Sequence, residues 1–175
     1  MNVFKSIVLF AINFIPILTT TNYKGKSPPG AFQSAYTVTQ YNYVVKGAGS
    51  DIKIDVECWM LQDSSWLNWR LPQLNDTGVL SHLLIHEQGH FNITILFAKR
   101  LKQECGKVDA SHPDAETPRL LKIKERLDYE SSAMNDKYEN ETRNGRDIVE
   151  QGKWNKLISA ELSKLDGLNV RIYFK

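Results

Sequence analysis

The sequence lacks the features that mark membrane-spanning, nucleic-acid-binding and fibrous proteins. It contains no run of 18 or more apolar residues, so no segment is predicted to span a membrane. Its 22 Lys and Arg against 20 Asp and Glu give a formal charge of only +2, which is too balanced to indicate a nucleic-acid partner. Only 10 Gly and 6 Pro are present, without a regular period, and this excludes a collagen-like chain.

The remaining composition is that of an ordinary globular protein. Over 175 residues, 42% are apolar and 24% are charged, so the chain can bury a core and is not predicted to be disordered. This length suits one domain. The sequence shows no internal repeat, and nothing in it fixes an oligomeric state.

The N-terminus has the layout of a secretory signal peptide. Lys5 precedes an apolar stretch over residues 6–18, and three threonines follow it. We therefore predict that residues 1–21 are removed and that the protein is periplasmic or secreted, with no stable membrane span after cleavage. The alternative is a buried N-terminal helix or an uncleaved anchor. Residues 22–34, rich in Lys, Pro, Gly and Ser, are predicted to be a tether, which leaves residues 35–175 as the domain.

The chain has only two cysteines, Cys58 and Cys105. In an oxidising compartment an isolated pair is a candidate disulfide, and two buried free thiols are the alternative. Neither cysteine has a second Cys or His at the spacing of a metal site, so a thiolate-bound metal is not expected.

Periodicity predicts an α+β domain with a small antiparallel sheet. Alternating apolar residues indicate strands over residues 35–46 and 51–61, joined as a hairpin, and a last short strand over residues 168–174. Trp66 and Trp69 are expected to pack under the sheet.

Two helical regions dominate the second half of the chain. Apolar residues recur at helical spacing from Val79 to about Lys107, after a capping sequence at residues 75–78 and before a stop at Gly106. Residues 110–118 contain two prolines and are predicted to be a loop. Residues 119–165 are predicted to form one long helix, or two helices joined near Asn144 and Gly145.

The first of these helices contains the motif His-Glu-Gln-Gly-His at residues 86–90, an HExxH sequence. Positions i and i+4 lie on one helix face, so His86 and His90 can bind one Zn²⁺ at about 2.1 Å each. Glu87 is then placed to take a proton from a metal-activated water. Gly89 is costly inside a helix, and it is easier to explain if another group must approach the backbone closely.

A third metal ligand must come from another part of the chain. His82 lies about 12 Å from His90 along the helix axis, which is too far for one zinc. Glu141 is the one charge on a seven-residue line of apolar positions in the long helix, so it is the best candidate. Glu139 would serve only if this register is wrong. Tyr138 is either a buried core residue or an aid to oxyanion stabilisation.

The segment from His86 to Ile93 resembles the HEQGHFDI-type motif of the DUF922 family of bacterial secreted proteins. Ser65-Trp66, the segment 138–145, and Gln151 with Trp154-Asn155 are also similar to that family. The resemblance covers roughly residues 35–165. It implies a zincin-like fold and a zinc-dependent protease acting on a peptide or protein, and it supplies no particular substrate.

The chain departs from the family pattern at two positions. Asn92 stands where the family has Asp, and Asn144 stands where it has His in a His-Gly pair. If that His is the family's third ligand, Glu141 or Glu139 must replace it here, because a neutral amide is a poor zinc ligand.

Three functions are therefore open. The first is a secreted zinc metallohydrolase, a peptidase in which His86, His90 and Glu141 hold the metal and Glu87 is the general base. The second is a non-catalytic zinc-binding module of the cell envelope. The third is an unrelated binding protein in which the motif occurs by chance.

Overall fold

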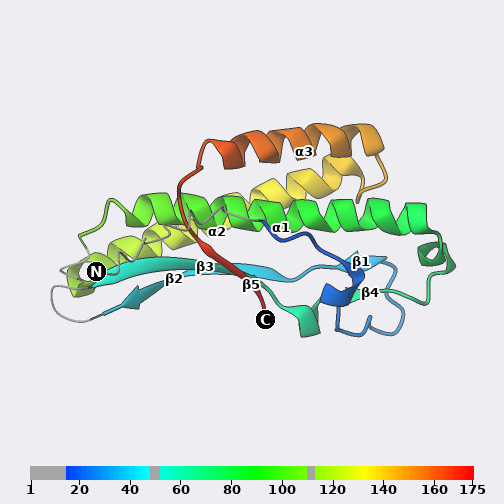
Figure 1. Cartoon of the computed structure of the whole chain (residues 1–175), viewed down its shortest axis with the longest axis horizontal. Coiled ribbons are helices and arrows are strands. Elements are labelled where there is room, and N and C mark those ends of the chain that lie inside the picture. Colours follow the sequence, from blue (N-terminus) through cyan, green and yellow to red (C-terminus); the bar gives the residue numbers. More distant parts are fainter. Residues whose placement is uncertain (1–14, 48–51, 110–112) are drawn as a thin grey trace, which may run out of the picture.

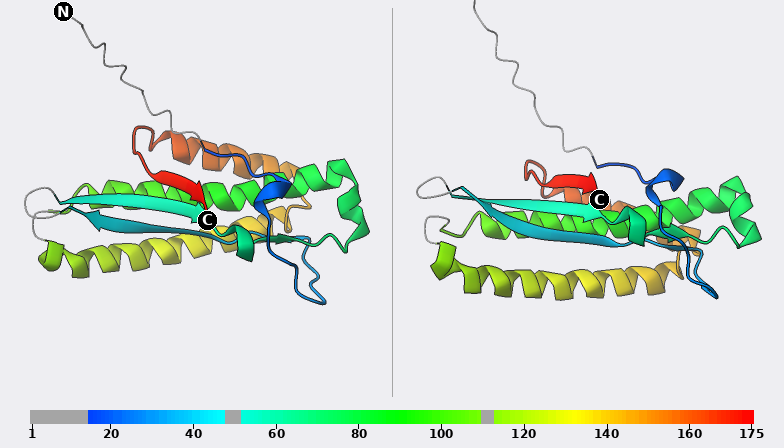
Figure 2. Two further views of the ribbon diagram at one scale, coloured as in Figure 1. Left: turned by 60° about the horizontal axis from the view of Figure 1, so that its bottom comes forward. Right: turned by 90° about the horizontal axis from the view of Figure 1, so that it is seen from below.

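The computed structural model describes residues 15–47, 52–109 and 113–175. Helix α1 (Thr77–Cys105) runs through the middle of the molecule and contacts the main sheet, α2 (Pro113–Thr142) and α3 (Ile148–Ser163) (Figure 1). The further views show the strands along one side of α1 and the other two helices around it (Figure 2). This arrangement confirms the predicted α+β class with a small sheet.

The predicted hairpin is present as β2 (Thr39–Lys46) and β3 (Lys53–Met60), which pair in antiparallel register. Alternation along β3 buries Val56, Cys58 and Met60. The last strand, β5 (Arg171–Phe174), joins the other edge of β3 in parallel, so the three-stranded sheet has the order β2-β3-β5 and is mixed.

The predicted strand over residues 35–46 is interrupted after its second residue. Its start forms a separate strand, β1 (Ala35–Tyr36), which pairs with β4 (Trp66–Leu67). Trp66 is buried and stacks on Tyr36, as expected of a core aromatic, whereas Trp69 is exposed and the packing predicted for it is wrong.

Helix α1 begins and ends where its local signals predict. Asp76 caps the N-terminus, because its carboxylate accepts hydrogen bonds from the backbone N–H groups of Gly78 and Val79. Gly106 follows the last helical residue. From Phe91 to Leu101 nearly every side chain is buried, which reflects contacts with other elements on several sides of the helix.

Helix α2 begins earlier than the prolines suggested. The predicted loop over residues 110–118 is wrong from Pro113 onward, and residues 110–112 lie outside the described residues. Proline is compatible with the first turn of a helix, where its missing N–H has no partner in any case, and one more proline near that end, Pro118, costs a single hydrogen bond.

The predicted break near Asn144 and Gly145 is present. Helix α2 ends at Thr142, and three consecutive residues then adopt left-handed φ angles: 53° at Arg143, 57° at Asn144 and 75° at Gly145. Asp147 caps the start of α3. The chain therefore reverses direction between α2 and α3.

The N-terminal residues that the structure describes pack on the domain. Leu18 is buried, and its backbone N–H donates to the Gln88 side chain on α1 at 2.7 Å. Asn22 and Tyr23, at the start of the predicted tether, are also buried. Removal of residues 1–21 stays a prediction, and residues 1–14 lie outside the described residues.

Cys58 and Cys105 are both buried free thiols, the alternative to the disulfide. Burial raises the pKa of both, that of Cys105 to about 11, so neither is a reactive thiolate at neutral pH. None of the described helices is both long enough and apolar enough to cross a bilayer.

Tyr138 of α2 packs directly against α1 at Gly89. A Cβ atom at this position would lie 2.5 Å from the ring carbon Cζ of Tyr138, which is closer than carbon atoms can pack. Gly89 is therefore required by packing, and this explains a glycine in the middle of a long helix.

We expect Gly89→Ala to destabilise the protein by about 1–3 kcal/mol, because the overpacking at Tyr138 outweighs the gain in helix propensity. The matched control is Gly152→Ala in α3, where an added Cβ meets nothing within 4 Å. That change should stabilise by about 0.4–1 kcal/mol. Urea unfolding of both variants in the presence of a chelator measures this. An unchanged or higher stability of Gly89→Ala would contradict the packing argument.

Candidate metal centre

Three side chains from two helices converge on one point. His86 and His90 come from α1 and Glu139 comes from α2, and one ligand atom of each lies within 4.8 Å of the others. The Nε2 atoms of the two histidines are 3.3 Å apart. Glu139 places Oε1 at 3.0 Å from Nε2 of His90 and Oε2 at 3.4 Å from Nε2 of His86.

The tautomer of His86 follows from its neighbours. Its Nδ1 atom lies 3.1 Å from Oε1 of Gln151. The amide nitrogen of Gln151 is already committed, because it donates to the Tyr138 hydroxyl and to Asn155. The group that faces His86 is thus an acceptor, so Nδ1 carries the proton and Nε2 presents a lone pair to the cluster.

The same arrangement holds His90. Its Nδ1 atom lies 2.8 Å from Oδ1 of Asn135, and the amide nitrogen of Asn135 donates to the backbone carbonyl of Ser131. Both imidazoles are therefore oriented by amide oxygens behind them, which is the usual arrangement for histidines that bind a metal through Nε2.

Electrostatics at the cluster favours a cation. The neighbouring imidazoles, first that of His86 and then that of His90, lower the pKa of Glu139 to about 2, so its carboxylate is charged. The atom Oε2 of Glu139 is buried without a hydrogen-bond partner. Two imidazole lone pairs and a charged carboxylate with an unsatisfied buried oxygen repel one another in this arrangement. A metal ion at the centre would accept electron pairs from all three groups.

Tyr138 fixes the position of His86 rather than facing a substrate. Its hydroxyl donates to the backbone carbonyl of His86 at 2.8 Å and accepts from Gln151. Its ring stacks on the imidazole of His86, with centroids 4.8 Å apart. Fully buried and with its hydroxyl engaged, Tyr138 is the core residue of the two predicted alternatives.

Gly145 closes the other side of the same imidazole. A Cβ atom on Gly145 would lie 2.8 Å from Cγ of His86, so only glycine allows the turn after α2 to come this close. The left-handed φ of this residue adds a second reason for glycine.

Glu87 lies beside the cluster and does not belong to its ligand set. It is buried, and the hydroxyl of Thr37 donates a short hydrogen bond to its Oε2 atom. The Thr37 hydroxyl also lies 2.9 Å from that of Tyr23. Burial raises the pKa of Glu87 above its ordinary value, although the neighbouring histidines and Thr37 act in the opposite direction. A raised pKa suits a carboxylate that must accept a proton.

The structure places Glu139, and not the predicted Glu141, beside the two histidines. The side chain of Glu141 is 45% exposed, and it accepts a hydrogen bond from Nε1 of Trp154 at 2.9 Å. The physical reason is that positions seven residues apart rotate by about 20° on each repeat, so the line that is buried at Leu120 has left the core when it reaches Glu141.

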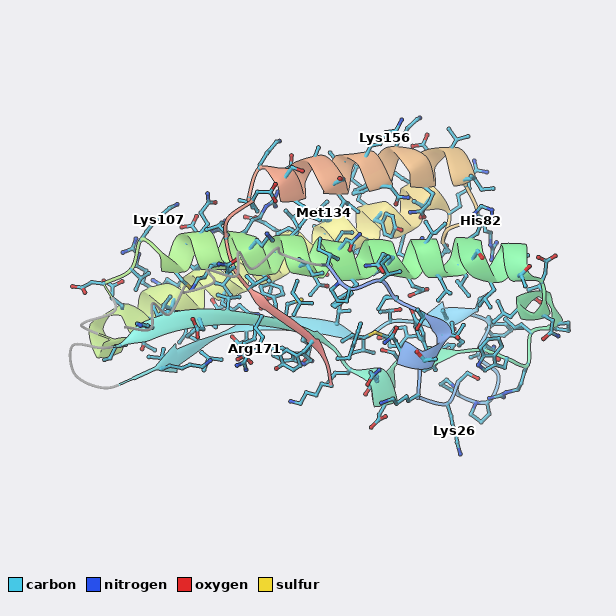
Figure 3. All side chains as sticks on the ribbon, viewed as in Figure 1. Lys26, His82, Lys107, Met134, Lys156 and Arg171 are labelled. Atoms are coloured by element: carbon cyan, nitrogen blue, oxygen red, sulfur yellow. The ribbon has the colours of Figure 1, made fainter. Side chains whose placement is uncertain are left out.

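The other predicted candidates lie outside the ligand set. His82 is exposed on α1, one turn before His86, and is labelled in Figure 3. Asn144 lines the cavity beside the cluster, whereas Asn92 accepts a hydrogen bond from Gln88 on another face of α1. Neither departure from the family pattern therefore removes one of the three ligands.

Asn135 and Thr37 contact the site residues His90 and Glu87, and neither was predicted from the sequence. Asn135 could have been found, because it lies one helical turn before Glu139 and hence on the same face of α2. Thr37 gave no local signal, since it reaches Glu87 only through the packing of the segment between β1 and β2 on α1.

Two cavities border the cluster. One has a volume of about 540 Å³ and reaches His86, Glu87 and Glu139 from the start of α1. The other, of about 400 Å³, reaches Glu87, His90 and Glu139 from the segment between β1 and β2. Ala35, Glu87 and Glu139 line both cavities, which therefore adjoin each other at the cluster.

No protein-family model, no curated protein and no solved structure matches this chain. The conclusions about the site therefore come from its own geometry, and the resemblance to the DUF922 family stays a prediction.

Proposed function

We propose that the protein is a zinc-dependent metallohydrolase that cleaves peptides, with a zincin-like arrangement of its HExxH helix. The observation that carries the proposal is the convergence of three ligand atoms within 4.8 Å, beside a buried carboxylate that is not one of them. The resemblance to secreted DUF922 proteins and the N-terminal sequence support action outside the cytoplasm.

The donor set favours zinc among the common metals. Two neutral imidazoles and one carboxylate are the three-residue set typical of catalytic zinc sites, which keep a fourth position for water or substrate. Calcium and magnesium prefer oxygen ligands alone. A bound Zn²⁺ would supply Lewis acidity and lower the pKa of a water molecule to about 7.

The protein side chains provide the proton transfers. Glu87 accepts one proton from the attacking water while the water oxygen bonds to the carbonyl carbon of the peptide. Glu87 then delivers this proton to the amide nitrogen as the C–N bond breaks, and the second hydrogen of the water leaves with the new carboxyl group. The hydrogen bond from Thr37 holds one oxygen of Glu87, which leaves the other oxygen for this exchange.

A non-catalytic zinc-binding module is the second candidate, and one observation favours it. Asn144 lines the cavity at the cluster, where the resembling family has an imidazole. A neutral amide cannot act as a cationic donor to developing charge, so the site would bind metal and turn over poorly.

We expect the full chain to bind about one zinc ion, and Glu139→Gln to weaken this binding by more than the ~10–100-fold that loss of an outer-shell partner causes. Glu141→Gln is the matched control, two residues away on the same helix, and should retain the metal. Elemental analysis and competition with a chromogenic chelator measure both. Zinc retained by Glu139→Gln and lost by Glu141→Gln would overturn the ligand assignment.

Glu87→Gln should slow hydrolysis strongly while keeping the metal, because the amide preserves the shape of the side chain and cannot accept the proton. The expected loss is on the order of 10²–10⁴ in rate. Cleavage of a proteome-derived peptide mixture, followed by mass spectrometry, measures it beside the zinc content. If the zinc-loaded parent cleaves no peptide at all, the non-catalytic module is the correct function.

A further inference from the structure

The larger of the two cavities beside the cluster has, among its polar lining residues, a group of large apolar side chains from separate parts of the chain. They are Phe32, Leu74, Val79, Leu83 and Ile148, and they meet His86 and Glu87 at its inner end. A cavity of about 540 Å³ is large enough for one large side chain with its adjoining backbone.

Several of these apolar groups are exposed to solvent. Phe32 is 95% exposed, Ile148 is 60% exposed and Val79 is 41% exposed. They come from the segment before β1, the start of α3 and the first turn of α1. Exposed apolar groups that surround one polar cluster are typical of a binding site, because their burial is left to the ligand.

One cation stands among the lining residues. The guanidinium of Arg146 takes part in none of the hydrogen bonds or ion pairs formed within the described residues, and this residue is exposed. Its place is set by the turn after α2, which Gly145 packs against His86. A positive charge at this position disfavours a Lys or Arg side chain in the cavity.

The smaller, adjoining cavity has a different chemistry. It is lined by polar groups that include Thr37, Asn135 and Asp136 in addition to the cluster residues. An extended peptide that crosses the cluster would therefore meet an apolar subsite on the side of α3 and a polar one on the side of β2.

We propose that the cavity formed by Phe32, Val79, Leu83 and Ile148 beside His86 receives an apolar side chain of the substrate, adjacent to the bond that is cleaved. This inference rests on the proposed function and adds its specificity: the protein selects Leu or Phe at this position over Gly and over Lys.

The test uses hydroxamates, which bind zinc directly and report on the cavity without turnover. Two series carry the variable side chain on one side or the other of the hydroxamate group, and each includes Leu, Gly and Lys. Titration calorimetry with the zinc-loaded full chain should show, in one series, Leu binding at least about tenfold more tightly than Gly, because the buried side chain leaves water. In that series Lys should bind more weakly than Leu.

Two pairs of variants localise the effect. Ile148→Asn should reduce the Leu preference, whereas Val149→Asn should not, since Val149 is also exposed at the start of α3 and does not line the cavity. Arg146→Glu should improve binding of the Lys compound, whereas Arg143→Glu in the same turn should leave it unchanged. Zinc content and unfolding temperature of each variant confirm that the metal site is intact.

The possible results distinguish failure of the apolar subsite from failure of the proposed metallohydrolase function. Equal affinity for Leu, Gly and Lys in both series, with zinc bound, would overturn the apolar subsite and leave the metallohydrolase untouched. A preference that Ile148→Asn and Val149→Asn change equally would place the subsite elsewhere and would also overturn it. Absence of zinc-dependent hydroxamate binding by the parent would overturn the proposed function, and the inference with it.

Discussion

The contact of Tyr138 with the backbone of α1 at Gly89 sets the geometry of the site. The ring occupies the space that any larger residue at position 89 would need, so glycine at this position lets α2 pack Tyr138 directly against α1. Glu139 is the next residue in α2, and this approach brings its carboxylate within 3.4 Å of both histidine Nε2 atoms. The spacing of the two helices thus determines whether three ligands can share one ion.

The fold and the site were predictable wherever local signals act. The cap at Asp76, the stop at Gly106, the β2–β3 hairpin and the paired histidines of α1 depend on neighbours a few residues away. The parallel pairing of β5 with β3 and the early start of α2 depend on distant packing, and periodicity carries no information about either.

The prediction of Glu141 as the third metal ligand shows how a small error in the assumed helical repeat accumulates along α2. The buried positions of α2 follow each other at intervals of seven and four residues, which is the repeat of a straight helix with slightly more than 3.6 residues per turn. These positions are Leu120, Leu127, Ser131, Tyr138 and Thr142. A strict repeat of seven therefore predicts buried positions correctly at the start of the helix. At its end, where Glu139 lies, the same repeat predicts burial for an exposed position. Glu141 instead accepts a hydrogen bond from the indole N–H of Trp154, and this bond links α2 to α3.

The short turn after α2 connects the ligand geometry with the expected selectivity. Gly145 presses on His86, Asn144 lines the adjoining cavity, and Arg146 places a charge beside it. Three candidate ligands converge without Asn144, so in the proposed function we expect its difference from the family pattern to affect the treatment of substrate charge and not metal retention. Proton transfer is proposed for Glu87, whose hydrogen bond to Thr37 does not involve this turn. The three proposed roles therefore rest mainly on different residues, which meet where His86 and Glu87 line the cavity.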